Sequence, residues 1–292
     1  MIFISTSCFH EKKSVIKILK EYSKQGIKNI ELGASHEYEE NIMEFLKEYK
    51  KKHDAEFTIH AYFPPEKNPF IINLASQKPD AVGKSISKIK KMIDTAKELD
   101  AKLCGFHAGF LVESEELGKP LDKSNRFEYE KGYKTFLESA KEICQYAKSK
   151  GVKIAFEPNV VSSYNVVGDK NELALMCKTG EIKRFYRDLE ALGINNLGLL
   201  LDLGHLKVTA NNLKFDAEEF VGAFRSKVAE IHIHENEGKI DEHKPLKKDS
   251  WGLRIINKYG FKNVLITLEV NNLNLDGIES QSKLLLEAIG KE

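Results

Sequence analysis

Short apolar runs alternate with longer amphipathic segments along nearly the whole chain. The short runs have the length and composition of buried strands, and the stretches between them have helical spacing. In the first such stretch, apolar positions within Val15–Tyr22 share one face opposite lysines, and Ile42–Tyr49 repeats the pattern. The predicted strands are Ile2–Ser5, Asn29–Leu32, Glu56–His60, Lys102–His107, Val152–Glu157, Leu197–Asp202, Val228–His232 and Asn263–Glu269. Further helices are predicted at about 80–98, 127–149, 181–192, 216–226 and 276–289, with an extra short helix near Asn171–Lys178.

The alternation of strands and helices predicts parallel pairing, because each helical crossover returns the chain to the same end of the sheet. The length of 292 residues suits one eightfold barrel, for which about 250 residues is typical. A doubly wound open sheet is the alternative, but no G-x-G-x-x-G follows a predicted strand and no change in composition marks a domain boundary. We therefore expect a single α/β domain over residues 1–292, folded as a (β/α)8 TIM barrel.

Charge and cysteine content narrow the classes of partner. The 45 basic and 44 acidic residues nearly cancel, so the chain has no global field that would attract nucleic acid or an anionic membrane. Its four cysteines stand far apart without a C-x-x-C pair, which is typical of reduced thiols in a cytoplasmic protein. The opening MIFISTSCFH has no basic leader, and no apolar stretch is long enough to cross a bilayer. We expect a soluble, cytoplasmic protein with no membrane partner.

Chemically competent side chains gather at the ends of the predicted strands, where barrel enzymes place their active sites. Six successive strands end in good ligands for a divalent cation, namely His60, His107, Glu157, Asp202, His232 and Glu269. One such residue alone is more often structural, but six ionisable groups around one mouth are costly to bury unless a cation or mutual pairing compensates them. Downstream of these strand ends lie His205, Asp241 and His243. The sequence therefore predicts a metal site, in which His234 has no assigned role.

Glu157 and Glu269 form a candidate acid/base pair. They end strands that are far apart in the sequence, so they can approach a bound metal from different sides. A metal that holds two adjacent substrate oxygens acidifies the C–H bond between them, and one carboxylate can remove that proton while the other returns one. This is the chemistry of aldose–ketose isomerisation and of epimerisation beside a carbonyl. The same residues could instead activate water against a phosphodiester, particularly with two or three metals.

Eight short motifs follow one another along the chain: TIHAYF (58–63), IINLAS (71–76), CGFHAG (104–109), AFEPN (155–159), LLLDLGH (199–205), EIHIHEN (230–236), DEHKPL (241–246) and TLEV (267–270). In order and spacing they resemble the xylose isomerase-like barrels, which include endonuclease IV and many sugar isomerases and epimerases. The resemblance covers nearly the whole chain. It implies one metal held by Glu157, Asp202, His232 and Glu269, with the two glutamates as the catalytic proton-transfer pair. It also implies that His205 is a catalytic residue that contacts and orients the substrate.

The same resemblance carries an alternative. Endonuclease IV uses three zincs, and its remaining ligand positions match His60, His107, Asp241 and His243. Three features of the chain favour a small-molecule enzyme instead. Leu203-Gly204 stands where the repair enzyme usually has Thr-Cys, and Pro158–Val161 replaces its Asn-Thr-Ala-Gly. The loops ASHEYEEN (34–41) and VESEELG (112–118) are acidic, and glutamates at the rim would repel a phosphate backbone.

Two positions separate the chain from the ketohexose epimerases of the family. Ser163 and Gly238 occupy the places where those enzymes carry a second Glu and an Arg, so a free ketohexose is not the expected substrate. The loop after the seventh strand is lysine-rich, with Lys239, Lys244, Lys247 and Lys248. We expect one of these lysines to contact a phosphate or carboxylate on the substrate.

The sequence therefore favours a divalent-metal-dependent isomerase or epimerase acting on a small sugar or sugar derivative. The expected cofactor is Mn²⁺, Mg²⁺, Co²⁺ or Zn²⁺, with one ion favoured and up to three as the alternative. The competing function is a zinc-dependent endonuclease at abasic sites, and nucleic acid is a partner only in that case. A catalytically silent metal-binding barrel is the third class. The resemblance also allows a homo-oligomer.

Overall fold

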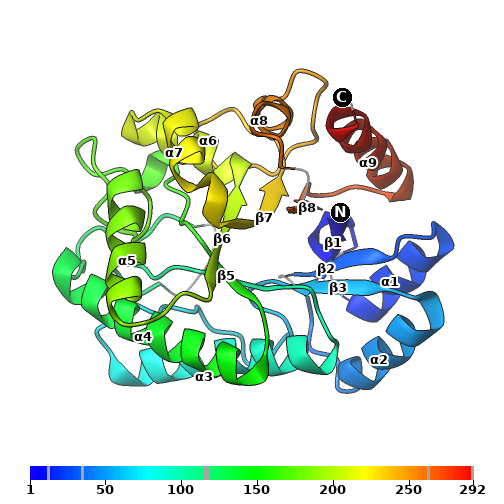
Figure 1. The fold of residues 1–292 in the computed structure, drawn as a ribbon, viewed down its shortest axis with the longest axis horizontal. Coiled ribbons are helices and arrows are strands. Elements are labelled where there is room, and N and C mark those ends of the chain that lie inside the picture. Colours follow the sequence, from blue (N-terminus) through cyan, green and yellow to red (C-terminus); the bar gives the residue numbers. More distant parts are fainter. Residues whose placement is uncertain (12–13, 34–35, 115–118, 262–263, 291–292) are drawn as a thin grey trace.

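Eight parallel strands close into a barrel in the computed structural model, which describes residues 1–11, 14–33, 36–114, 119–261 and 264–290 (Figure 1). Each strand pairs with the next in the chain, and β8 pairs with β1 in parallel register. The strands are β1 (Ile2–Ser5), β2 (Asn29–Leu32), β3 (Glu56–Ile59), β4 (Cys104–His107), β5 (Ile154–Glu157), β6 (Leu197–Asp202), β7 (Val228–Ile233) and β8 (Leu265–Leu268). The predicted (β/α)8 barrel is confirmed.

The helices lie outside the strands, as Figure 1 shows. The α-helices are α1 (Val15–Lys24), α2 (Ile42–His53), α3 (Pro79–Glu98), α4 (Tyr129–Lys150), α5 (Thr179–Ala191), α6 (Leu203–Leu213), α7 (Ala217–Phe224), α8 (Trp251–Tyr259) and α9 (Leu275–Ile289). The 3-10 turns are η1 (Thr6–Cys8), η2 (Ser163–Asn165) and η3 (Arg225–Lys227). In α1 the predicted face is buried at Val15, Leu19 and Tyr22, whereas Ile16 is half-buried and Ile18 is buried in addition. No described helix combines the length and apolarity needed to span a bilayer.

A small apolar cluster lies inside the barrel beneath part of its polar mouth. Leu103, Ala155 and Leu200 form a small buried cluster. Ala155 and Leu200 each precede an ionisable strand-end residue by two positions, so they share its face one layer deeper. Gly105 makes room there, because a Cβ at this position would lie 2.7 Å from the Leu200 side chain and 3.0 Å from the ring of His60. Part of the polar mouth therefore packs on apolar side chains.

The predicted extra helix near Asn171–Lys178 is wrong. This segment is irregular, and Ala174 forms an isolated β-bridge with Phe110 instead. The side chain of Asn171 takes up local backbone groups that a helix would use: it donates to the Ala174 carbonyl at 2.7 Å and accepts from the Leu173 and Ala174 amides. Asn263, the predicted start of the last strand, and Glu115 and Glu116 of the acidic rim lie outside the described residues.

Helix α6 was not predicted, although it begins directly after β6. The carboxylate of Asp202 caps it by accepting a hydrogen bond from the amide of His205 at 2.7 Å. Most residues of α6 are buried, so the segment lacks the alternation of apolar and polar faces that identifies an amphipathic helix. Because of this helix, Asp202 and His205 project from one rigid turn.

Candidate metal centre and active site

The six predicted strand-end residues all lie at the C-terminal mouth of the barrel. His107, Glu157 and Asp202 are the last residues of β4, β5 and β6, whereas His60 and Glu269 follow immediately after β3 and β8. His232 is the penultimate residue of β7 and pairs in register with Asp202. Parallel pairing brings these ends to one edge, so residues distant in the chain share one site.

Glu157 lies at the centre of a group of imidazoles. Its carboxylate is fully buried and lies 2.8 Å from His60 Nε2, 3.4 Å from His107 Nδ1 and 2.7 Å from His205 Nδ1. Burial alone would raise the pKa of Glu157, but the charges of His107 and His205 and the hydrogen bond from His60 hold that pKa well below its usual value. Glu157 is therefore an ionised carboxylate in a water-poor site.

His232 and Glu269 form the opposite side of the site. Nδ1 of His232 lies 3.1 Å from Glu269 and 4.0 Å from Asp202. Burial opposes ionisation of Glu269, but the charge and hydrogen bond of His232 hold the pKa of this carboxyl below its usual value. The four residues that the resemblance implies as ligands are divided between two groups, each with ligand atoms within 4.8 Å of one another: Glu157, Asp202 and His205 in one, and Glu31, His60, His232 and Glu269 in the other.

An outer group lies nearer the rim and contains Asp241 and His243. The Asp241 carboxylate lies 3.1 Å from His205 Nε2 and 3.0 Å from His243 Nε2. Burial would lower the pKa of His243, but the Asp241 carboxylate raises it to about 9. For His205, burial is likewise outweighed by Asp202, Asp241 and Glu157, which raise its pKa well above the usual value. His60, His107 and Glu157 form a further group of ligand atoms within 4.8 Å of one another.

His234, which received no role from the sequence, lies between the inner and outer groups. Its Nε2 is 3.2 Å from Asp202 and 3.6 Å from Asp241, and its ring stacks on that of His243 with centroids 3.9 Å apart. Gly204 creates the space, because a Cβ at this position would lie 2.1 Å from Cε1 of His234. The signals in the sequence were the spacing of two residues from His232 and the glycine in the Asp-Leu-Gly-His motif.

Sequence reasoning also missed two carboxylates inside the barrel. Glu31 of β2 and Glu230 of β7 are both buried, and Glu31 lies 2.7 Å from Nε2 of His232. Burial raises the pKa of Glu230 to about 7, and its carboxylate accepts a hydrogen bond from Thr267 at 2.6 Å. The signal was a glutamate within each apolar strand run.

The arrangement of buried polar atoms fits a bound divalent cation. Glu157 Oε1, Asp202 Oδ2, His205 Nδ1, His234 Nε2 and Asp241 Oδ1 are all buried, and none has a hydrogen-bond partner among the described residues. Unsatisfied buried groups cost free energy, and here they converge in one region although several lie within contact distance of one another. Carboxylate oxygens and imidazole nitrogens are ligands for Zn²⁺ and Mn²⁺ alike. The donor set therefore suits a metal.

A cavity of about 260 Å³ lies above these residues. Its floor includes His60, His107, His205, Asp241, His243 and Glu269, and its walls include Tyr62, Phe110, Leu121, Val160 and Tyr164. The loops after β4 and β5 form much of the wall and are joined by a hydrogen bond from the Leu121 amide to Asn165 at 2.9 Å. This volume is slightly below the usual range for ligand pockets, about 300–1,000 Å³. It suits a small molecule.

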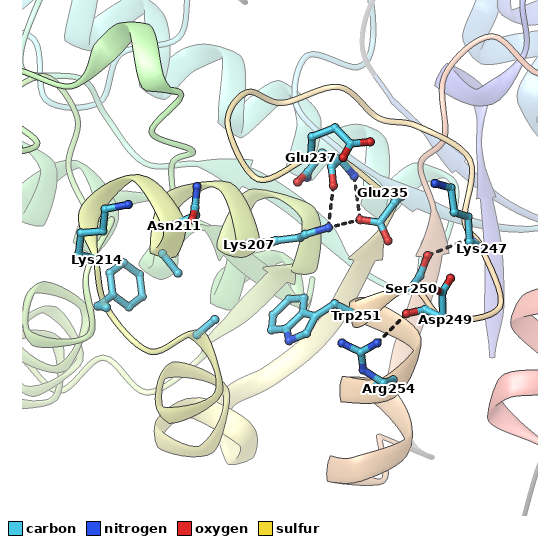
Figure 2. Close-up of a pocket in the computed structure, with 14 residues that line it drawn as sticks. Lys207, Asn211, Lys214, Glu235, Glu237, Lys247, Asp249, Ser250, Trp251 and Arg254 are labelled. Atoms are coloured by element: carbon cyan, nitrogen blue, oxygen red, sulfur yellow. Dashed lines mark hydrogen bonds and ion pairs between the residues drawn. The ribbon is translucent and has the colours of Figure 1, made fainter.

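A larger cavity of about 660 Å³ lies between α6, α7 and the start of α8 (Figure 2). Lys247 lines this second cavity, and Lys244 pairs with Glu242 at 2.7 Å. Neither lysine lines the cavity above the site, whose lining includes Lys119 instead. Lys239 and Lys248 are also absent from its lining, and a contact between one of the four lysines and the substrate stays a prediction. Figure 2 also shows Lys207 of α6 bound to Glu235, which fastens the chain just after His234.

Replacing Gly204 by Ala is expected to displace His234, because the added Cβ has no space beside the ring. Overpacking of this kind costs about 1–3 kcal/mol. We expect a lower Tm and weaker binding of Co²⁺, measured by thermal unfolding and by titration of the cobalt absorption spectrum. Gly180→Ala in α5 is the matched control, since nothing lies within 4 Å of its added Cβ. Equal Tm and cobalt affinity in both variants would contradict the packing argument.

Comparison with known proteins identifies the family. The model of the xylose isomerase-like TIM barrel family matches residues 19–289. An uncharacterized protein of Methanocaldococcus jannaschii is 24% identical over 284 residues, with 94% of each chain covered. Among solved structures, a D-tagatose 3-epimerase-like protein is 19% identical with a TM-score of 0.75, covering 99% of this chain and 98% of that one. D-Psicose 3-epimerase from Clostridium cellulolyticum H10 is 15% identical with a TM-score of 0.66, covering 99% and 95%.

These structures share the fold, and the family model covers most of the sequence. The chain therefore belongs to the xylose isomerase-like TIM barrel family.

Proposed function

We propose that this protein is a metal-dependent isomerase or epimerase of a small sugar or sugar derivative. One observation carries the proposal: buried carboxylates and imidazoles with unsatisfied atoms converge beneath a cavity of about 260 Å³. Glu269 lies on the floor of the cavity, and Glu157 lies just below it, hydrogen-bonded to His60. The likeness to a D-tagatose 3-epimerase-like protein and a D-psicose 3-epimerase supports a carbohydrate substrate.

The proposed roles follow from position. Glu157, Asp202, His232 and Glu269 would hold the ion, and the place of His234 beside Asp202 adds it to the candidate ligands. When bound, a divalent cation would polarise adjacent oxygens of the substrate and acidify the C–H bond between them.

The two glutamates would carry out the proton transfer. In an epimerisation, one carboxylate would accept the proton from one face of the carbon while the other delivers a proton to the opposite face. His205, next to both Glu157 and Asp241, would orient a substrate hydroxyl. The aromatic and aliphatic walls would exclude water from the exchanging carbon.

Exchange of a substrate hydrogen with solvent tests this chemistry directly. Protein loaded with Mn²⁺ or Co²⁺ is incubated in D2O with aldoses, ketoses, sugar acids and sugar phosphates, and deuterium incorporation beside the carbonyl is followed by NMR and mass spectrometry. We expect incorporation with at least one member of the panel, together with a new isomer or epimer. Stoichiometric metal binding without exchange across the panel would favour the silent metal-binding barrel.

An endonuclease remains the second candidate because of one observation. The outer groups, His60 with His107 and Glu157, and His205 with Asp241 and His243, are assembled at positions that match the zinc ligands of endonuclease IV. Plasma mass spectrometry of the purified protein decides between the two functions together with a cleavage assay on an abasic duplex. About three zinc ions per chain with strand cleavage would favour the endonuclease, whereas about one exchangeable ion without cleavage favours the isomerase.

A further inference from the structure

The two ring nitrogens of His232 face two different carboxylates. Nε2 lies 2.7 Å from Glu31 and Nδ1 lies 3.1 Å from Glu269. We propose that Glu31 is a positioning residue that holds Nε2 of His232, so that the ring presents Nδ1 to the metal site. The inference rests on the proposed function, because His232 is one of the candidate metal ligands and Glu31 would hold it in place.

Glu31 reaches His232 across the interior of the barrel. It lies on β2, which pairs with β1 and β3, whereas His232 lies on β7, which pairs with β6 and β8. Both side chains have an exposed fraction of 0%. The contact is therefore made inside the barrel and is shielded from water.

The Glu31 carboxylate makes no hydrogen bond within the described part of the chain. Its ion pair is with Nε2 of His232 at 2.7 Å, and that nitrogen likewise has no hydrogen-bond partner among the described residues. Burying an ionised carboxylate costs several kcal/mol unless a partner compensates it. The imidazole of His232 is therefore the group placed to compensate the buried Glu31 carboxylate.

Glu230 provides a matched comparison. It is also a buried glutamate near Nε2 of His232, but its carboxylate is 4.0 Å away and accepts a hydrogen bond from Thr267. The two glutamates therefore differ in distance to the ring and in whether they have another partner. At a pH above 8, Glu230 is ionised despite its raised pKa of about 7, so replacing Glu230 should weaken metal binding as much as replacing Glu31 if negative charge near Nε2 were the only requirement.

The proposed action is that of an outer carboxylate on a metal-binding histidine. Such a group fixes which nitrogen faces the metal and limits rotation of the ring, and its removal costs about 10- to 100-fold in metal affinity. Glu31 would thus act on the ion through His232 without touching it. The variant Glu31→Gln keeps the size of the side chain, and Glu31→Asp keeps the charge but draws it back by one methylene.

Cobalt titration of the metal-free protein tests the proposal. We expect Glu31→Gln to bind Co²⁺ about 10- to 100-fold more weakly than wild type, Glu31→Asp to be intermediate, and Glu230→Gln to stay within about twofold. The positions and intensities of the cobalt d–d bands should be the same in all four proteins, because no ligand is exchanged. A Glu31→Gln affinity equal to that of wild type would overturn the proposal, and so would altered bands, which would make Glu31 itself a ligand.

NMR of metal-free protein labelled with ¹⁵N-histidine gives a readout that needs neither metal nor turnover. We expect a solvent-protected Nε2–H signal of His232, assigned by its absence in His232→Asn, in wild type and Glu230→Gln but not in Glu31→Gln. If Glu31→Gln retains the signal, Glu31 does not hold the ring. If wild type binds no metal, the proposed function fails, while this signal still decides the role of Glu31.

Discussion

Replacing Glu157 by Gln is expected to lower kcat by on the order of 10³-fold, within the range that general acid/base groups contribute. The variant keeps the volume of the side chain but cannot exchange a proton at pH 7. It also loses an ionised group that faces three imidazoles, so metal affinity should fall as well. Steady-state kinetics at saturating Mn²⁺ separate the two effects. Glu269→Gln is expected to behave similarly, because Glu269 holds the opposite position in the proposed proton transfer.

The control for this experiment is Glu172→Gln. Glu172 lies in the loop after β5 but pairs with Arg126 at the surface, so its replacement should leave kcat unchanged. Circular dichroism and Tm establish that the variants are folded. Near-normal turnover in both Glu157→Gln and Glu269→Gln would refute the proposed acid/base pair, whereas loss of turnover in only one would indicate a reaction that uses a single proton-transfer group.

Metal affinity is expected to rise steeply with pH between about 6.5 and 9. Nearby carboxylates raise the pKa of His205 and His232 well above the usual value, against the effect of burial, and raise that of His243 to about 9. The metal-free site therefore holds protons that a cation must displace. Each proton released makes the affinity change about tenfold per pH unit. Titration with Zn²⁺ or Co²⁺ at several pH values measures the slope.

The stability of the metal-free protein should change in the opposite direction and fall as pH rises. A histidine whose pKa is raised on folding contributes stability below its unfolded pKa and loses that contribution as pH rises through the folded pKa. Metal-free protein should thus lose Tm between about pH 6.5 and 9, and the metal-loaded protein should lose less. A metal affinity independent of pH would show that the histidines are already neutral and would contradict the charge pairing described here.

The fold was predictable because local patterns and global architecture agree. The regular alternation of eight strands with helices is typical of one closed architecture, the (β/α)8 barrel. The predicted bounds of all eight strands agree with the structure to within one or two residues where those residues are described. Two errors have local causes. Asn171 uses its side chain to break a segment that reads as helical, and α6 is buried on nearly all sides and therefore lacks an amphipathic pattern.

The candidate site was predictable in composition but not in arrangement. Strand ends supply His60, His107, Glu157, Asp202 and Glu269 because parallel strands end at one edge. The distance between two residues along the chain does not indicate whether they meet across the barrel. Glu31 contacts His232 although the two residues are 201 positions apart in the chain. Likewise, the space that Gly204 leaves for His234 is visible only when β7 and α6 are side by side.

The carboxylate of Asp202 caps helix α6 and is also a candidate metal ligand, so both helix formation and metal binding depend on it. One of its oxygens accepts the amide hydrogen of His205, while the other is buried without a hydrogen-bond partner among the described residues. A cation that withdraws electron density from this carboxylate would weaken it as an acceptor, but would also immobilise it. Ion binding and fraying of the first helical turn are therefore thermodynamically linked. Amide hydrogen exchange at His205 would report occupancy of the site from the protein backbone, without any substrate.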